Sequence, residues 1–254
     1  MASVRSLCAV VACRNNGSRL YGKPLQNLDV ENKFKILDQV VLNLQNLQCI
    51  NEVILAISSG SDNISFIDYA SSNSLRFVIG DEIDVLQRLI QGLDLSGATD
   101  IFRVTSESPF LYWQPVEDAW VQHLDSNADA TFLDDIIDGC GFEIITTDSM
   151  RRSWALGDSF YRSELCSLFI RHNKDLFNIQ LIPCPSELIR KDLRLTVDYP
   201  EDLIVCRSVY SKLVKNSPNG MLDLLPAVDF LDNSPQLKNL IAPYTEAGYS
   251  LMYH

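Results

Sequence analysis

Short apolar runs alternate with helical patterns through the first 105 residues, and this alternation restricts the fold more than any other feature. Strands are predicted at 7–13, 53–57, 75–79 and 100–105, and helices at 36–47, 63–72 and ending near residue 95. A β-α-β-α order implies a mostly parallel sheet with helices on both faces. Because ligands bind at the carboxyl ends of such strands, the loops that follow them are expected to surround one site.

The second half of the chain is less regular. Helices are predicted at 115–124, 149–156, 163–172, 201–213, 221–232 and 237–241, and strands at 130–133, 142–147, 178–184 and 193–197. No internal repeat, low-complexity tract or flexible linker divides the sequence. We therefore predict one domain over 1–254, with a small inserted lobe over about 134–192.

The loop after the first strand carries three cations among small polar residues. Arg14, Arg19 and Lys23 lie in a segment that also holds Asn15, Asn16, Gly17 and Ser18. Backbone N–H groups of such a loop, with nearby cations, form a site for phosphate. The alternative is a solvated loop in which charges happen to cluster, and the residues alone leave both interpretations open.

The overall charge limits the partners. A net charge of −12 argues against binding to nucleic acid, which requires a basic face, but a local cationic loop still attracts an anionic nucleotide. No apolar run approaches 18 residues and no signal peptide is recognisable, so we expect a cytoplasmic protein without a membrane segment. The seven cysteines form no C-x-x-C pair, which indicates reduced cysteines rather than disulfides or a zinc site.

Two motifs carry a resemblance to a known family. The loop RNNGSRLYGKPL at 14–25 and the run RLTVDYPEDL at 194–203 resemble the cytidylyltransferases that activate acidic sugars, especially the spore-coat polysaccharide SpsF type. The resemblance covers roughly residues 5 to 245, more loosely from 110 to 190. It implies a Rossmann-like, GT-A-like three-layer α/β fold, a homodimer, and transfer of CMP from CTP to a sugar acid or sugar phosphate for surface-glycan biosynthesis.

The resemblance also implies roles for single residues on the nucleotide side. Arg14, Arg19 and Lys23 are expected to act in catalysis by holding the departing pyrophosphate. The expected nucleotide contacts are spread over four strand ends and comprise Ala12, Arg14, Asn16, Gly17, Ser18, Lys23, Ser58, Ser59, Gly80 and Arg103.

A magnesium ion is expected between two carboxylates. The resemblance makes Asp198 a ligand and puts Glu107 where the family has a second aspartate. Because a glutamate is one methylene longer, it suits the near-octahedral geometry of Mg²⁺ less well, and the alternative is a loop acid without metal. Glu201 and Asp202 are expected to be structural first-turn acids of a helix that begins near Pro200. Asp84 is expected to cap a helix or to contact substrate.

The acceptor side departs most from the family. Glu143 and Arg162 are the expected substrate contacts, with a solvent-facing strand residue as the alternative for Glu143. The family's R-E-H run is incomplete here because its histidine is missing, so acceptor recognition is expected to differ. Two other functions stay open: a transferase of the same fold that uses another nucleotide or a non-sugar phosphate acceptor, and a non-catalytic nucleotide-binding protein in a glycan-assembly complex.

Overall fold

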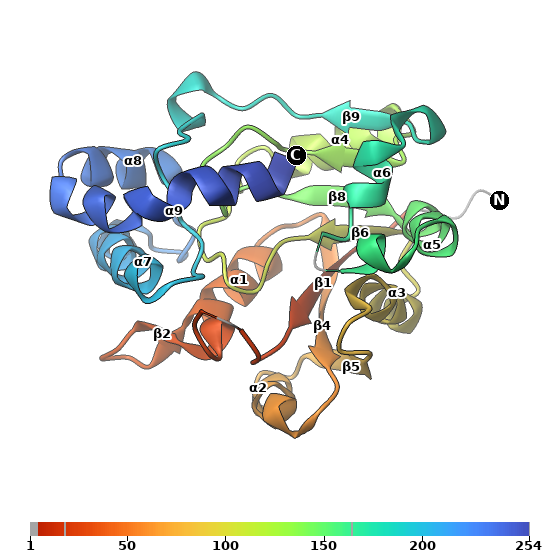
Figure 1. Cartoon of the computed structure of the whole chain (residues 1–254), viewed down its shortest axis with the longest axis horizontal. Helices are drawn as coiled ribbons and strands as arrows, with labels where there is room; N and C mark the ends of the chain where they lie inside the picture. The colour runs from red at the N-terminus through yellow and green to blue at the C-terminus, as the bar shows by residue number, and fades with distance from the viewer. Residues whose placement is uncertain (1–4, 18, 164, 254) are drawn as a thin grey trace.

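A seven-stranded sheet forms the centre of the fold, with strands from both halves of the chain (Figure 1). The computed structural model describes residues 5–17, 19–163 and 165–253, with side chains up to residue 246. The sheet order is β5-β4-β1-β6-β8-β7-β9. Its strands are β1 (Leu7–Cys13), β4 (Ile50–Ser58), β5 (Arg76–Gly80), β6 (Asp100–Arg103), β7 (Ala130–Phe132), β8 (Glu143–Thr146) and β9 (Ile179–Leu181).

The sheet is mostly parallel, as predicted. Strands β5, β4, β1 and β6 pair in parallel, and β7 pairs in parallel with β9. Strand β8 runs against both of its neighbours and pairs Glu143, its first residue, with Arg103, the last residue of β6. The predicted α/β class with a mostly parallel sheet is therefore confirmed, with one strand reversed near its middle.

Helices cover both faces of the sheet (Figure 1). The α-helices are α1 (Ile36–Gln45), α2 (Ile64–Ser72), α3 (Val85–Ser96), α4 (Val116–Asp125), α5 (Thr147–Leu156), α6 (Leu168–His172), α7 (Pro200–Leu213), α8 (Leu224–Asp232) and α9 (Pro235–Tyr253). Side chains of β1 alternate between two cores: Ala9 and Val11 pack in one, Cys8 and Val10 in the other. Strand β1 is therefore buried on both faces.

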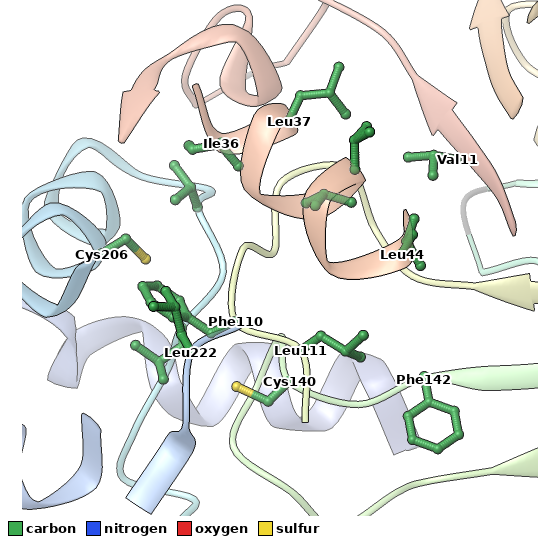
Figure 2. Close-up of a cluster of buried hydrophobic side chains, with 14 of the residues drawn as sticks. Val11, Ile36, Leu37, Leu44, Phe110, Leu111, Cys140, Phe142, Cys206 and Leu222 are labelled. Atoms are coloured by element: carbon green, nitrogen blue, oxygen red, sulfur yellow. The ribbon is translucent and has the colours of Figure 1, made fainter. Parts of the chain in front are cut away.

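The larger core holds α1 against the sheet. Figure 2 shows Ile36, Leu37 and Leu44 of this helix beside Val11, with Phe110 across the cluster. The apolar side chains of α1 recur with helical spacing, and the Asp38 carboxylate accepts the backbone N–H of Lys35 at 2.6 Å to cap its first turn. Burial of each large apolar side chain contributes about 1.5–3 kcal/mol, so packing and capping both favour this helix.

The predicted strand at 193–197 does not form. The segment makes an isolated bridge between Asp138 and Arg194, and its N–H groups bond to two different loops. Leu195 donates to the Asp138 carbonyl at 2.8 Å, and Val197 donates to the Glu107 carbonyl at 3.1 Å. Because no neighbouring strand offers a continuous row of partners, the extended chain joins no ladder.

Other boundaries also differ from prediction. The helix predicted at 163–172 is regular only as α6, the helix predicted at 221–232 begins at Leu224, and 237–241 lies within the 19-residue α9. A short hairpin of β2 (Asn27–Asp29) and β3 (Phe34–Lys35) was not predicted. Residues 134–192 contribute β8 and β9 to the main sheet, and their role as an inserted lobe stays a prediction.

Candidate functional site

Two cavities that share a wall lie at the carboxyl ends of β1 and β6. The smaller, of about 80 Å³, is lined by residues that include Val10, Ala12, Asn16, Pro24, Val85, Arg88, Leu89 and Ser106. The larger, of about 330 Å³, is lined by residues that include Gly17, Arg19, Asp134, Asp138, Glu143, Ser167, Arg171, Arg194 and Asp198. Both are lined by Arg14, Lys23, Arg103 and Glu107. The loops that follow β1 and β6 thus gather at one site, as expected, whereas the described residues that end β4 and β5 do not line either cavity.

The cationic loop after β1 is held by a buried asparagine. The backbone N–H of Asn15 donates to the Asn63 side chain at 2.8 Å, and its carbonyl accepts the N–H of Gly22 at 2.9 Å. Gly22 has a φ of 60°, a left-handed conformation that glycine adopts without strain. A side chain at Gly17 would bring its Cβ to 2.7 Å from the Leu20 carbonyl oxygen. These contacts hold the backbone at Asn15 and Gly22 and leave no room for a side chain at Gly17.

Two of the predicted cations meet the two predicted metal ligands in the larger cavity. The Lys23 ammonium lies 2.6 Å from Asp198 Oδ1 and 3.9 Å from Glu107 Oε1. The Arg19 guanidinium lies 3.4 Å from the same Asp198 oxygen. Arg14 lines the same cavity. Segments that are 84 or more residues apart in the sequence thus converge, as the two motifs predicted.

Asp198 is positioned by a buried arginine and by the cap of α7. The Arg194 guanidinium, 2% exposed, donates to Asp138 at 2.7 Å, to Asp202 at 3.0 Å and to Asp198. Asp202 also accepts the backbone N–H groups of Asp198 and Tyr199, at 2.8 and 2.9 Å. The predicted structural role of Asp202 is thus confirmed. Burial acts to raise the pKa of Asp198, but the charges around it, that of Lys23 first, bring the pKa below its ordinary value.

Glu143 is a buried carboxylate that joins several residues of the larger cavity. It accepts hydrogen bonds from Arg103 at 2.7 Å, Arg171 at 2.9 Å and Ser167 at 2.6 Å. Burial acts to raise its pKa, but the Arg103 and Arg171 charges outweigh that effect and hold the pKa at about 2. Asp134 holds the other edge of the Arg171 guanidinium at 2.7 and 3.0 Å. The alternative of a solvent-facing Glu143 is therefore wrong.

The predicted nucleotide-contacting residues at the ends of β4 and β5 lie apart from the cavity walls. Ser58 ends β4 opposite Gly80 of β5, and the Ser59 N–H donates to the Gly80 carbonyl at 2.8 Å. Within the described residues, neither serine nor Gly80 lines either cavity. Arg88, 1% exposed, lies between Gly80 and the smaller cavity, and it lines that cavity instead.

Arg162 is also not brought to the cavities within the described part of the chain. Its guanidinium stacks over Trp154 and donates to the carbonyls of Trp154 and Gly157 at 3.0 and 3.1 Å. These local bonds hold the Arg162 guanidinium at the carboxyl end of α5. Ser18, predicted to contact the nucleotide, lies outside the described residues.

Asp84 caps a helix. Its carboxylate accepts the Gln87 N–H at 2.8 Å at the start of α3 and the Trp154 indole N–H at 2.8 Å. The prediction of a cap at this position is therefore confirmed.

Sequence reasoning missed Arg171, Asp134 and Ser167. They lie in the stretch where the family resemblance is loose, and no local spacing links them to Arg103 or Glu143. The weak signal available was Arg171 itself, a cation in a short helix rich in apolar residues.

Two features are absent from the described residues. No group of three or more histidine, cysteine, aspartate or glutamate side chains could hold a metal ion by itself. None of the described helices has the length and apolar content that crossing a bilayer requires.

Known proteins resemble this chain in sequence and in fold. No protein-family model matches the sequence. An uncharacterized protein of Methanocaldococcus jannaschii is 24% identical over 243 residues, which cover 96% of this chain and 97% of that protein. The spore coat polysaccharide biosynthesis protein SpsF of Bacillus subtilis is 23% identical over 207 residues, which cover 80% of this chain and 85% of SpsF.

Solved structures agree with the sequence relatives. A cytidylyltransferase from Leptospira borgpetersenii has a TM-score of 0.80 at 15% identity, over 92% of this chain and 97% of that chain. A CMP-2-keto-3-deoxy-manno-octonic acid synthetase in complex with CTP has a TM-score of 0.61 at 13% identity, over 82% of this chain and 99% of that chain. The predicted resemblance is confirmed: the chain is similar to SpsF over most of its length, and it shares its fold with a cytidylyltransferase and with a CMP-2-keto-3-deoxy-manno-octonic acid synthetase.

Proposed function

We propose that the chain transfers CMP from CTP to an acidic or phosphorylated sugar and releases pyrophosphate, in the biosynthesis of a surface glycan. The observation that carries this proposal is the meeting of Arg19 and Lys23 with Glu107 and Asp198 in one cavity. The similarity to SpsF, a protein of spore coat polysaccharide biosynthesis, and to a solved cytidylyltransferase supports the same reaction.

The cations of the first loop would hold the triphosphate. Arg14, Arg19 and Lys23 line the larger cavity, where they would neutralise the β- and γ-phosphates as pyrophosphate leaves. The acceptor oxygen would attack the α-phosphorus in line, so that one P–O bond forms and the bond to the pyrophosphate breaks. In this proposal the protein positions the two substrates and balances their charge, without a covalent enzyme intermediate.

Glu107 and Asp198 fit a magnesium ion that is shared with the nucleotide. One ammonium lies within ion-pair distance of both carboxylates, so both acids face the same small region of the cavity, where a cation would be attracted by each of them. Mg²⁺ is usually bound by one or two carboxylates together with substrate phosphates, which agrees with a site of two acids. When bound, Mg²⁺ would neutralise phosphate charge and polarise the phosphoryl group.

The acceptor half of the cavity would be shaped by the buried charges around Glu143. Since three donors hold its carboxylate, we propose that Glu143 keeps Arg103 and Arg171 in place rather than contacting the sugar itself. Arg103 borders both cavities, so its position affects the boundary between nucleotide and acceptor. Arg162 and the strand-end residues Ser58, Ser59 and Gly80 have no direct role in this proposal.

Location and assembly complete the proposal. Five of the seven cysteines are buried, as is usual for cysteines that pack as small apolar residues in a reducing, cytoplasmic setting. The homodimer implied by the resemblance is checked by light scattering of the purified protein, where a monomer mass would contradict it.

A screen for pyrophosphate release tests the proposed reaction. The purified protein is supplied with each of the four nucleoside triphosphates and with panels of sugar acids and sugar phosphates, with Mg²⁺ present. Release is expected with CTP, and Asp198→Asn is expected to lower the rate by a factor of about 10² or more because it removes a charge from the proposed metal site. Asp229→Asn, on the exposed face of α8, is the matched control.

The same screen separates the other candidates. Release with another nucleotide would favour a transferase of the same fold with a different donor. Nucleotide binding without Mg²⁺-dependent release from any acceptor would favour a non-catalytic protein. Full activity of Asp198→Asn would contradict the proposed site.

A further inference from the structure

Asp198 is surrounded by cations. Its Oδ1 atom lies 2.6 Å from the Lys23 ammonium and 3.4 Å from the Arg19 guanidinium, and its Oδ2 atom accepts from Arg194. The Asp198 side chain is 19% exposed and that of Lys23 is 17% exposed. Water therefore screens the Lys23 pair only in part, and a divalent cation that approaches Asp198 meets positive charge already in place.

The three cations are not equivalent. Arg194 is buried and is also held by Asp138 and Asp202, so it belongs to the fixed frame around α7. Arg19 is more exposed, lies over the Tyr199 ring and makes the longest contact. Lys23 contacts both Asp198 and Glu107. Its ammonium is thus within ion-pair distance of both carboxylates that the proposed function assigns to the metal.

Lys23 could also pair with a phosphate of the proposed triphosphate. It lines both cavities and follows Gly22 in the loop expected to receive phosphate. A lysine side chain carries a compact charge on a flexible four-carbon stem, so its ammonium can turn from a carboxylate to a nearby phosphate. A triphosphate in the cavity would therefore draw the ammonium away from Asp198.

We propose that Lys23 occupies the metal position in the free protein and that the triphosphate opens this position by taking over Lys23. The inference rests on the proposed function and adds a binding order to it: the metal enters with the nucleotide or after it. By linkage, metal and triphosphate then strengthen each other's binding, beyond the contacts that they make with one another.

A titration with Mn²⁺, followed by electron paramagnetic resonance in the absence of nucleotide, tests the inference. The free protein is expected to bind Mn²⁺ weakly. Lys23→Met is expected to bind it about tenfold more tightly, within the range of about 5–150-fold typical of coupling between two sites. Lys23→Gln serves as a second variant, and thermal unfolding checks that each variant is folded.

Two controls assign the effect to this site. Lys212→Met, on the exposed end of α7, also removes one positive charge and is expected to leave Mn²⁺ affinity within about twofold of the parent, since separated exposed charges are screened. Adding Asp198→Asn to Lys23→Met is expected to remove the gain. Unchanged or weaker binding by both folded Lys23 variants would overturn the inference, as would an equal gain in Lys212→Met.

Failure of the inference and failure of the proposed function give different results. If Lys23→Met shows no gain while the parent releases pyrophosphate from CTP in a Mg²⁺-dependent reaction, the inference fails and the function stands. If Lys23→Met shows the gain and the parent releases no pyrophosphate, the cation exchange is real and the proposed reaction is wrong.

Discussion

Replacing Glu143 by glutamine tests how much one buried carboxylate stabilises the wall of the larger cavity. Glutamine keeps the shape of the side chain and one acceptor oxygen, but it removes the charge that Arg103 and Arg171 share. The pKa of Glu143 is about 2, against an ordinary value of 4.5. Because a tenfold change in proton affinity corresponds to about 1.4 kcal/mol, the ionised carboxylate contributes about 3 kcal/mol to the free energy of unfolding.

The sign of the pH dependence follows from the lowered pKa. A carboxylate whose pKa is lower in the folded state contributes its full stabilisation above the ordinary value of 4.5 and loses it as the pH falls toward 2. The difference between parent and Glu143→Gln is therefore expected to shrink from about 3 kcal/mol at pH 7 to roughly half of that at pH 3.

Urea unfolding at the two pH values measures this difference, with exposed Glu31→Gln as the matched control. The control is expected to change the unfolding free energy by less than about 0.5 kcal/mol. A difference for Glu143→Gln below about 1 kcal/mol at pH 7, or one that does not change with pH, would refute the reasoning.

Two further substitutions test the frame around the site. Arg194→Met leaves the carboxylates of Asp138 and Asp202 without their buried partner and is expected to cost about 3–5 kcal/mol in urea unfolding, so a loss below about 1 kcal/mol would contradict the assigned role. Asp84→Ala removes the cap of α3 and is expected to lower the unfolding free energy by about 1 kcal/mol in the same assay. Asp84→Asn keeps an acceptor and should recover most of that loss, and an asparagine variant as unstable as the alanine variant would argue against the cap.

The first half of the fold was predictable because local pattern and burial agree there. The run 7–13 is apolar throughout and forms β1, which is buried on both faces. The stripe at 36–47 matches the face that α1 buries. The loop between them could be recognised from its cations and glycines, because these residue types are the ones a phosphate site requires.

The second half depends on distant contacts that no local pattern encodes. The run 193–197 has the composition of a strand, but its backbone partners belong to two separate loops, so no ladder forms. The predicted helix 237–241 continues through Pro243, which usually marks an end.

Side-chain partners were the least predictable part of the site. Arg162 and Arg171 are both cations in the same loosely matching stretch of sequence. Local carbonyls hold Arg162 at the end of α5, whereas Asp134 and Glu143 hold Arg171 at the cavity. Which arginine lines the cavity depends on these tertiary partners rather than on the spacing of the residues.

Strand β8 runs antiparallel to its neighbours, and this changes which segment of the chain reaches the site beside it. In a parallel strand the loop at the ligand edge follows the strand, as residues 14–23 follow β1. Because β8 runs the other way, the residues before it, 133–142, reach that edge, and Glu143 meets Arg103 there. If the proposed function is correct, residues 133–142 would face the acceptor and could change in length and sequence while the loop proposed to hold the phosphates keeps its position. Nucleotide binding and acceptor choice would then be encoded by separate segments of the chain.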